Sequence, residues 1–172
     1  NSAVAWASAL PGQARQVHAI PLEGAATTLP TALFFNAEDQ GIHFGRDAVA
    51  QYLKGSAGRL TAGHSGRPDC PALQEQTLVN GQQISFQDII SRFLLELRTR
   101  AAAQVGGQLP ATVVMGRPVH FVDDDPKRDA LAEDSLRQTA LSAGFEHVSF
   151  QLQPIAAALD YDQRITQQSL VL

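Results

Sequence analysis

The chain has 172 residues, of which 44% are hydrophobic and 17% are charged, and its formal net charge is −4. This length and composition predict one folded domain with an ordinary hydrophobic core, and they argue against an intrinsically disordered chain. The negative charge is spread along the sequence, which argues against a nucleic-acid partner and against an anionic membrane surface.

The cysteine content and the lengths of the apolar runs narrow the expected class further. Cys70 is the single cysteine, which excludes an internal disulfide and a multi-cysteine zinc site. No apolar run reaches the roughly 18 residues that a membrane span needs. We therefore expect a cytoplasmic protein.

The first half of the chain predicts strands followed by a variable insert. Gly41–Phe44 is expected to be a short strand, and Asp47–Leu53 one or two helical turns. Residues 55–73 are rich in glycine and proline and follow no period, so they are expected to be loop. Three earlier runs predict an antiparallel meander: residues 2–8, 15–21 and 31–35.

The second half of the chain is more regular and predicts alternating helices and strands. Ser85 and Asp88 are spaced as in a capping box, and the helix that they open is expected to end at Gly106 and Gly107. The side chains expected to share its buried face are Ile89, Ile90, Phe93, Leu94, Leu97 and Ala101.

A strand–helix–strand–helix pattern follows. Residues 111–116 form a continuous apolar run, typical of a buried strand, and residues 147–152 alternate as a strand does. Between them we expect a helix with Asp125 as its N-cap, Pro126 at its first position and Gly144 at its end. Its expected buried stripe is Ala132, Leu136, Ala140 and Ala143.

The stretch QLQPIAAALDYD, residues 151–162, contains a proline that ends a strand and opens a helix at the same point. The whole pattern predicts an α/β fold in which helices cover a mixed sheet. The chain starts and stops within apolar runs typical of strands, so we expect it to be a piece of a longer polypeptide.

Few residues stand out as candidates for chemistry. Gln153 lies where a strand meets a helix N-terminus, a frequent place for phosphate and water chemistry, although capping or solvent exposure is the simpler interpretation. Asp123, Asp124 and Asp125 are interpreted as helix capping rather than a metal site. Arg117 is interpreted as a strand-end ion pair rather than an anion site. The histidines at 18, 43, 64, 120 and 147 show no metal-binding spacing, and we expect no metal on this chain.

Several segments, taken together and in order, resemble the nucleotide-binding domain of DnaK-type heat-shock chaperones, in particular their YegD-like branch. These segments are NSAVA, LPTALFF, VVMGRPVHF, LSAGF and HVSFQLQPIAAALDYD, and the resemblance covers residues 1–53 and 82–172. It implies an actin-like ATPase fold, a ribonuclease H-like lobe, with a variable insert at about 42–82. The chain would be the first, incomplete lobe of that domain.

The resemblance also implies which residues matter. Asn1 and Ser2 match the tail of the family's first phosphate-binding turn, while Pro118 and Arg128 match residues that couple nucleotide state to the rest of the chaperone. The intact protein would bind ATP or ADP with magnesium, and it would meet unfolded client proteins and co-chaperones through regions outside this chain. We expect no bound cofactor on the chain itself.

Two positions depart from the family pattern. Gln153 stands where the family has a glutamate, and the family's catalytic lysine is missing from residues 61–73, where Arg67 is the nearby cation. The resemblance implies an ATP-dependent chaperone, and because the lobe is incomplete we expect the isolated chain to be inactive. The alternatives are a nucleotide- or partner-binding module without turnover, or a sugar- or acetate-kinase-like member of the same fold.

Overall fold

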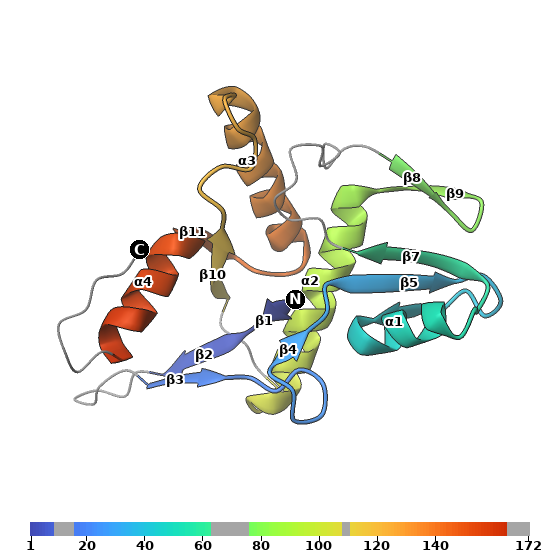
Figure 1. The fold of residues 1–172 in the computed structure, drawn as a ribbon, viewed down its shortest axis with the longest axis horizontal. Coiled ribbons are helices and arrows are strands. Elements are labelled where there is room, and N and C mark those ends of the chain that lie inside the picture. The colour runs from blue at the N-terminus through green and yellow to red at the C-terminus, as the bar shows by residue number, and fades with distance from the viewer. Residues whose placement is uncertain (9–15, 63–75, 108–110, 165–172) are drawn as a thin grey trace. The chain divides into compact units, whose positions relative to one another are not determined.

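The computed structural model describes residues 1–8, 16–62, 76–107 and 111–164, which form a mixed α/β structure with small sheets and four helices (Figure 1). These residues divide into two compact units, one ending at residue 107 and the other beginning at residue 111. Within the described residues, no helix combines the length and the apolar character that crossing a membrane requires.

The first unit opens with two antiparallel strand pairs. β2 (Ala5–Ser8) pairs with β3 (Gln16–Ala19), as the sequence predicts. The expected strand at 2–8 is interrupted at Val4, whose carbonyl accepts a hydrogen bond from the backbone N–H of Ile20 at 2.8 Å. Its first part, β1 (Ser2–Ala3), pairs with β4 (Thr28–Leu29) instead.

The third expected strand, β5 (Ala32–Asn36), does not extend that meander within the described residues. It lies between β6 (Ile42–Phe44) and β7 (Gly58–Ala62), and both pairings are antiparallel. Figure 1 shows β5 beside β7. β5 is therefore the central strand of this sheet, and all five of its residues are buried.

The loop prediction for residues 55–73 is wrong over β7. A Cβ atom on Gly58 would lie 2.2 Å from the carbonyl oxygen of Phe35, so this glycine permits the close approach of β7 to β5. Glycine marks a strand contact here, and sequence reasoning took it for a loop signal. Residues 63–73 lie outside the described part of the chain.

Helices cover both faces of this sheet. α1 (Gly45–Leu53) packs Ala48 against Ala32 and Phe34, and it confirms the expected helix at 47–53. On the other face lies α2 (Phe86–Gln104), which follows a hairpin of β8 (Gln76–Val79) and β9 (Gln82–Ser85).

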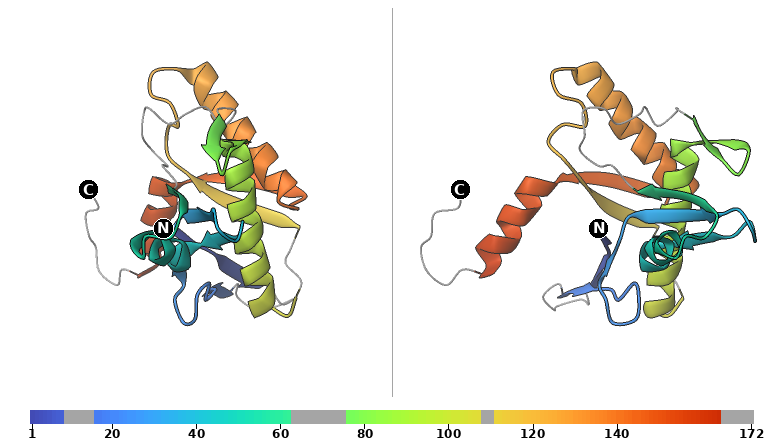
Figure 2. Two further views of the ribbon diagram at one scale, coloured as in Figure 1. Left: turned by 90° about the vertical axis from the view of Figure 1, so that its right-hand side faces the viewer. Right: turned by 45° about the vertical axis from the view of Figure 1, so that its right-hand side comes forward.

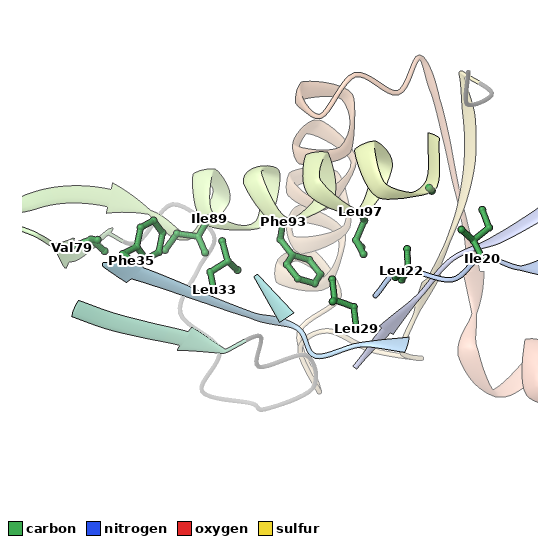
Figure 3. Close-up of a cluster of buried hydrophobic side chains, with 10 residues drawn as sticks. Ile20, Leu22, Leu29, Leu33, Phe35, Val79, Ile89, Phe93 and Leu97 are labelled. Carbon is green, nitrogen blue, oxygen red and sulfur yellow. The ribbon is translucent and has the colours of Figure 1, made fainter. Parts of the chain in front are cut away.

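The N-terminus of α2 confirms the predicted capping box. The Ser85 hydroxyl accepts a hydrogen bond from the backbone N–H of Asp88 at 3.0 Å, and it donates one to the Asp88 carboxylate at 2.7 Å. Four of the six expected inward side chains are buried, while Ile90 and Leu94 are partly exposed. The main core forms where this helix meets the strands (Figure 3); its residues are Ile20, Leu22, Leu29, Leu33, Phe35, Val79, Ile89, Phe93, Leu97 and Ala101.

The second unit is a parallel strand–helix–strand motif followed by a helix. β10 (Thr112–Arg117) and β11 (His147–Leu152) pair in parallel, and α3 (Pro126–Ser142) connects them (Figures 1 and 2). Asp125 caps α3 through a 3.0 Å hydrogen bond from the backbone N–H of Arg128, and Gly144 follows the helix with a φ of 94°. The predicted caps of α3 are confirmed.

Two burial predictions in this unit fail in part. β10 alternates between exposed and half-buried side chains, and Val114 is 65% exposed, because only one face of the strand points toward α3. In the expected stripe of α3, Ala140 and Ala143 are buried, whereas Ala132 and Leu136 are only half-buried.

α4 (Gln153–Arg164) begins directly after β11, so Pro154 opens a helix where a strand ends, as the sequence predicts. Its described side chains are exposed, and they include the large apolar residues Ile155, Leu159 and Tyr161. The strand expected to begin near residue 170 lies outside the described residues.

Candidate functional site

The candidate site lies at the carboxyl ends of β10 and β11. Because the strands are parallel and in register, Gly116 pairs with Gln151, and Arg117 pairs with Leu152. The segment after β10 and the first turn of α4 therefore start at the same edge of the sheet. In open α/β sheets, ligands bind outside this edge, where helix N-termini offer free backbone donors.

Gln153 is the first residue of α4, and its side chain is exposed and lies over Gly116. A Cβ atom added to Gly116 would lie 3.2 Å from Cγ of Gln153 and 3.5 Å from its Nε2. The absence of a side chain at 116 thus leaves room for the amide. Gln153 can donate and accept hydrogen bonds but carries no charge.

Arg117 points to the opposite face of the sheet, toward α3, and its side chain is only 12% exposed. Its guanidinium group donates to the Asp129 carboxylate at 2.9 Å and also to the Glu133 carboxylate. Burial alone would lower the pKa of Arg117, but the hydrogen bonds and the attraction to both carboxylates outweigh it and raise the pKa. The predicted strand-end ion pair is confirmed, and Arg117 has no free charge for an anion.

Asp129 joins this ion pair to the segment after β10. Its Oδ1 accepts hydrogen bonds from the backbone N–H groups of Phe121 at 2.5 Å and Val122 at 3.4 Å. The bond from Arg117 is the main cause of a lowered pKa at Asp129; burial opposes it, and the two backbone donors add to it. The carboxylate therefore stays charged well below neutral pH.

A hollow of about 630 Å³ lies between this segment and the start of α3, and its lining residues are His120, Val122, Asp123, Asp124, Asp125, Pro126 and Asp129. The Asp125 carboxylate accepts a hydrogen bond as the cap of α3, and the Asp129 carboxylate is paired with Arg117. Across the described ranges, no three histidine, cysteine, aspartate or glutamate side chains converge in a way that would hold a metal ion.

The two residues expected to couple nucleotide state to the rest of the protein have different surroundings. The Pro118 carbonyl accepts a hydrogen bond from Nε of Arg117 at 3.1 Å, which ties it to the ion pair. The Arg128 side chain is exposed, and no ion pair joins it to another described residue. Asp129, its neighbour in α3, instead accepts a hydrogen bond from Arg117, whose Nε donates to the Pro118 carbonyl.

Asn1 and Ser2 belong to the first unit. The Ser2 hydroxyl lies 2.8 Å from the Thr31 hydroxyl, and Asn1 is exposed. These contacts are ordinary for a short strand beside a turn. The second unit brings together Gln153, Gly116 and Pro118 through the end of β10.

Sequence reasoning missed Gly116, Asp129 and Glu133. The last two were detectable, because they stand four residues apart on a predicted helix and follow a strand that ends in arginine. Gly116 was not detectable, because it matters only through its contact with Gln153, which lies 37 positions later in the chain.

No protein-family model matches the chain. The resemblance to DnaK-type chaperones is therefore carried by the quoted segments alone, and it stays a prediction. The α/β character of the fold does not depend on it.

The described residues do not by themselves fit a magnesium nucleotide. The edge of the sheet supplies one neutral amide, Gln153, and the guanidinium group at the end of β10, Arg117, is already paired with two carboxylates. Phosphate groups need free cations or clustered backbone donors, and magnesium needs oxygen ligands with charge nearby. Any such site requires residues beyond those described.

Proposed function

We propose that the chain is the first lobe of the ATPase domain of a DnaK-type molecular chaperone. The intact protein would bind ATP with magnesium and hydrolyse it, and this chain would contribute the sheet edge that carries Gln153. The quoted sequence segments support the proposal, and so does a parallel strand pair in which β11 leads directly into the N-terminus of α4.

The single observation that carries the proposal is the position of Gln153 over Gly116. The side chain stands at the carboxyl edge of the sheet, exposed and next to the first turn of α4. An amide in this place can hold a water molecule by hydrogen bonds and orient it. Phosphoryl transfer depends mainly on positioning and on charge neutralisation, so an orienting group contributes even without transferring a proton.

A second candidate function has a specific observation in its favour. Gln153 is neutral, and Arg117 is not free to neutralise phosphate charge, so the same edge also suits a module that binds a nucleotide or a partner without turnover. A kinase of the same fold that acts on a sugar or on acetate is the third alternative.

Phosphate release from ATP by a longer polypeptide separates these functions. The polypeptide would join this chain to the phosphate-binding turns and the second lobe that the resemblance implies. Release without an acceptor supports the chaperone ATPase. Phosphate transfer that requires a sugar or acetate supports the kinase, and tight ATP binding without any release supports the module without turnover.

A further inference from the structure

We infer that Arg117 is a positioning residue for Gln153. From one face of the sheet it fixes the backbone on which the amide rests on the other face. This inference deepens the proposed function, since it names the residue that holds the orienting group in place, and it does not involve Arg128.

The first step is the number of bonds that Arg117 makes to one short segment. Nε donates to the carbonyl of Pro118 and Nη2 to the carbonyl of Val119, each at 3.1 Å. The guanidinium carbon lies 4.7 Å from the centre of the Phe121 ring. A planar guanidinium group makes several directed bonds at once, which a lysine cannot do.

The second step is the anchor of Arg117. Asp129 and Glu133 hold its guanidinium group from two successive turns of α3, and Asp129 also accepts the backbone N–H of Phe121. Side chain and segment are therefore fixed to the same helix. The path of the chain after β10 is set by α3.

The third step is the alternation of side chains along a strand. Arg117 faces α3, so Gly116, one residue earlier, faces the other side, where Cγ of Gln153 packs onto it. The peptide between residues 116 and 117 belongs to both contacts. A shift of the Arg117 backbone therefore moves the surface beneath Gln153.

The test uses the full chain without nucleotide. Nuclear magnetic resonance would follow the side-chain amide of Gln153, identified by its loss in Gln153→Glu, and the backbone amide of Phe121. In Arg117→Met, we expect the Gln153 resonance to move. We also expect the exchange of the Phe121 amide to accelerate about 10-fold or more, because the Asp129 carboxylate that accepts its N–H is no longer held by the guanidinium group. Arg117→Lys keeps the charge and should give a smaller change in the same direction.

Two controls separate positioning from general destabilisation. Arg137→Met removes another guanidinium group, which also contacts Glu133 and lies over the Phe150 ring. Arg137 donates to the backbone carbonyl of Val148 in β11 and not to the segment after β10. Arg128→Met removes an exposed arginine one residue from Asp129. Both controls should leave the Gln153 resonance in place.

An unmoved Gln153 resonance in a folded Arg117→Met or Arg117→Lys variant would overturn the inference. So would an equal shift in Arg137→Met, because the response would then reflect lost stability alone. Since no nucleotide is present, these results do not depend on ATP hydrolysis. A responsive Gln153 in a protein whose longer form releases no phosphate would overturn the proposed function and leave the positioning role intact.

Discussion

At the scale of single residues, Gly116 links the end of β10 to Gln153. Its backbone pairs with Gln151 of β11, and it presents no side chain to the amide that lies over it. The space above this one residue sets where the amide of Gln153 can rest.

Replacement of Gly116 by alanine should displace Gln153 at little cost in stability. The new Cβ would lie 3.2 Å from the flexible Cγ of Gln153, so the exposed side chain moves and the strand does not. Alanine also suits a strand better than glycine by roughly 0.5–1 kcal/mol, which offsets the contact. A thermal melt and the Gln153 side-chain resonance would test this, and a melting temperature lowered by many degrees would contradict it.

Asp129 makes the segment after β10 sensitive to acid. Its pKa is lowered in the folded chain, chiefly by the hydrogen bond from Arg117, so its contribution to stability is present above the unfolded value of about 3.9 and is lost as the pH falls through the lower folded value. The Phe121 amide should report this loss in a pH titration. In Asp129→Asn the acid step at Phe121 should disappear, and an unchanged step would assign it to another carboxyl group.

At the scale of elements, β7 depends on a glycine that allows two strands to approach. In Gly58→Ala the Cβ would meet the Phe35 carbonyl oxygen at 2.2 Å and Cζ of Phe34 at 2.7 Å. We expect a loss of about 1–3 kcal/mol in the free energy of unfolding, measured by urea denaturation.

Gly55→Ala is the matched control for this prediction. Gly55 also has a positive φ, of 77°, but a Cβ added there would meet no described atom within 4 Å beyond its chain neighbours, so the substitution adds backbone strain alone. Gly58→Ala should cost clearly more than Gly55→Ala. Equal costs would show that the approach of β7 to β5 is not what Gly58 provides.

The elements that the sequence predicts well are those whose signals are local. Ser85 with Asp88 and Asp125 with Pro126 mark helix starts through bonds to their own first turns, and both starts are confirmed. β7 was missed because its glycine serves a strand that lies more than 20 positions earlier in the chain. The pairing of β5 with β6 and β7, and not with β3, was missed because the sequence pattern of a strand does not name its partner.

The same distinction applies to the candidate site. The sequence places Gln153 and Pro118 at the end of a strand, and the structure agrees. The contact of Gln153 with Gly116 depends on which side chains share one face of the sheet. The link from α3 to Pro118 depends on which side of the helix faces Arg117: Asp129 bonds to Arg117 and Arg128 does not. A linear sequence does not reveal these directions.

At the scale of the whole molecule, the chain should neither hydrolyse ATP nor bind it tightly on its own. Its candidate site offers a neutral amide and an arginine already paired with two carboxylates, which leaves phosphate charge without a partner there. Titration calorimetry with ATP and magnesium would measure this directly. A sub-micromolar dissociation constant would contradict the prediction.

The central proposal is that Gln153 would occupy the water-orienting position of a nucleotide site in the longer polypeptide. Its most direct test compares the rate of phosphate release by that polypeptide with Gln153 and with Gln153→Glu. A carboxylate adds the negative charge that the amide lacks, and a positioned acid or base group is typically worth about 10²- to 10⁴-fold in rate. We expect an increase near the lower end of that range, with ATP affinity nearly unchanged. Phosphate release that stays at background in Gln153→Glu while ATP still binds would contradict the account.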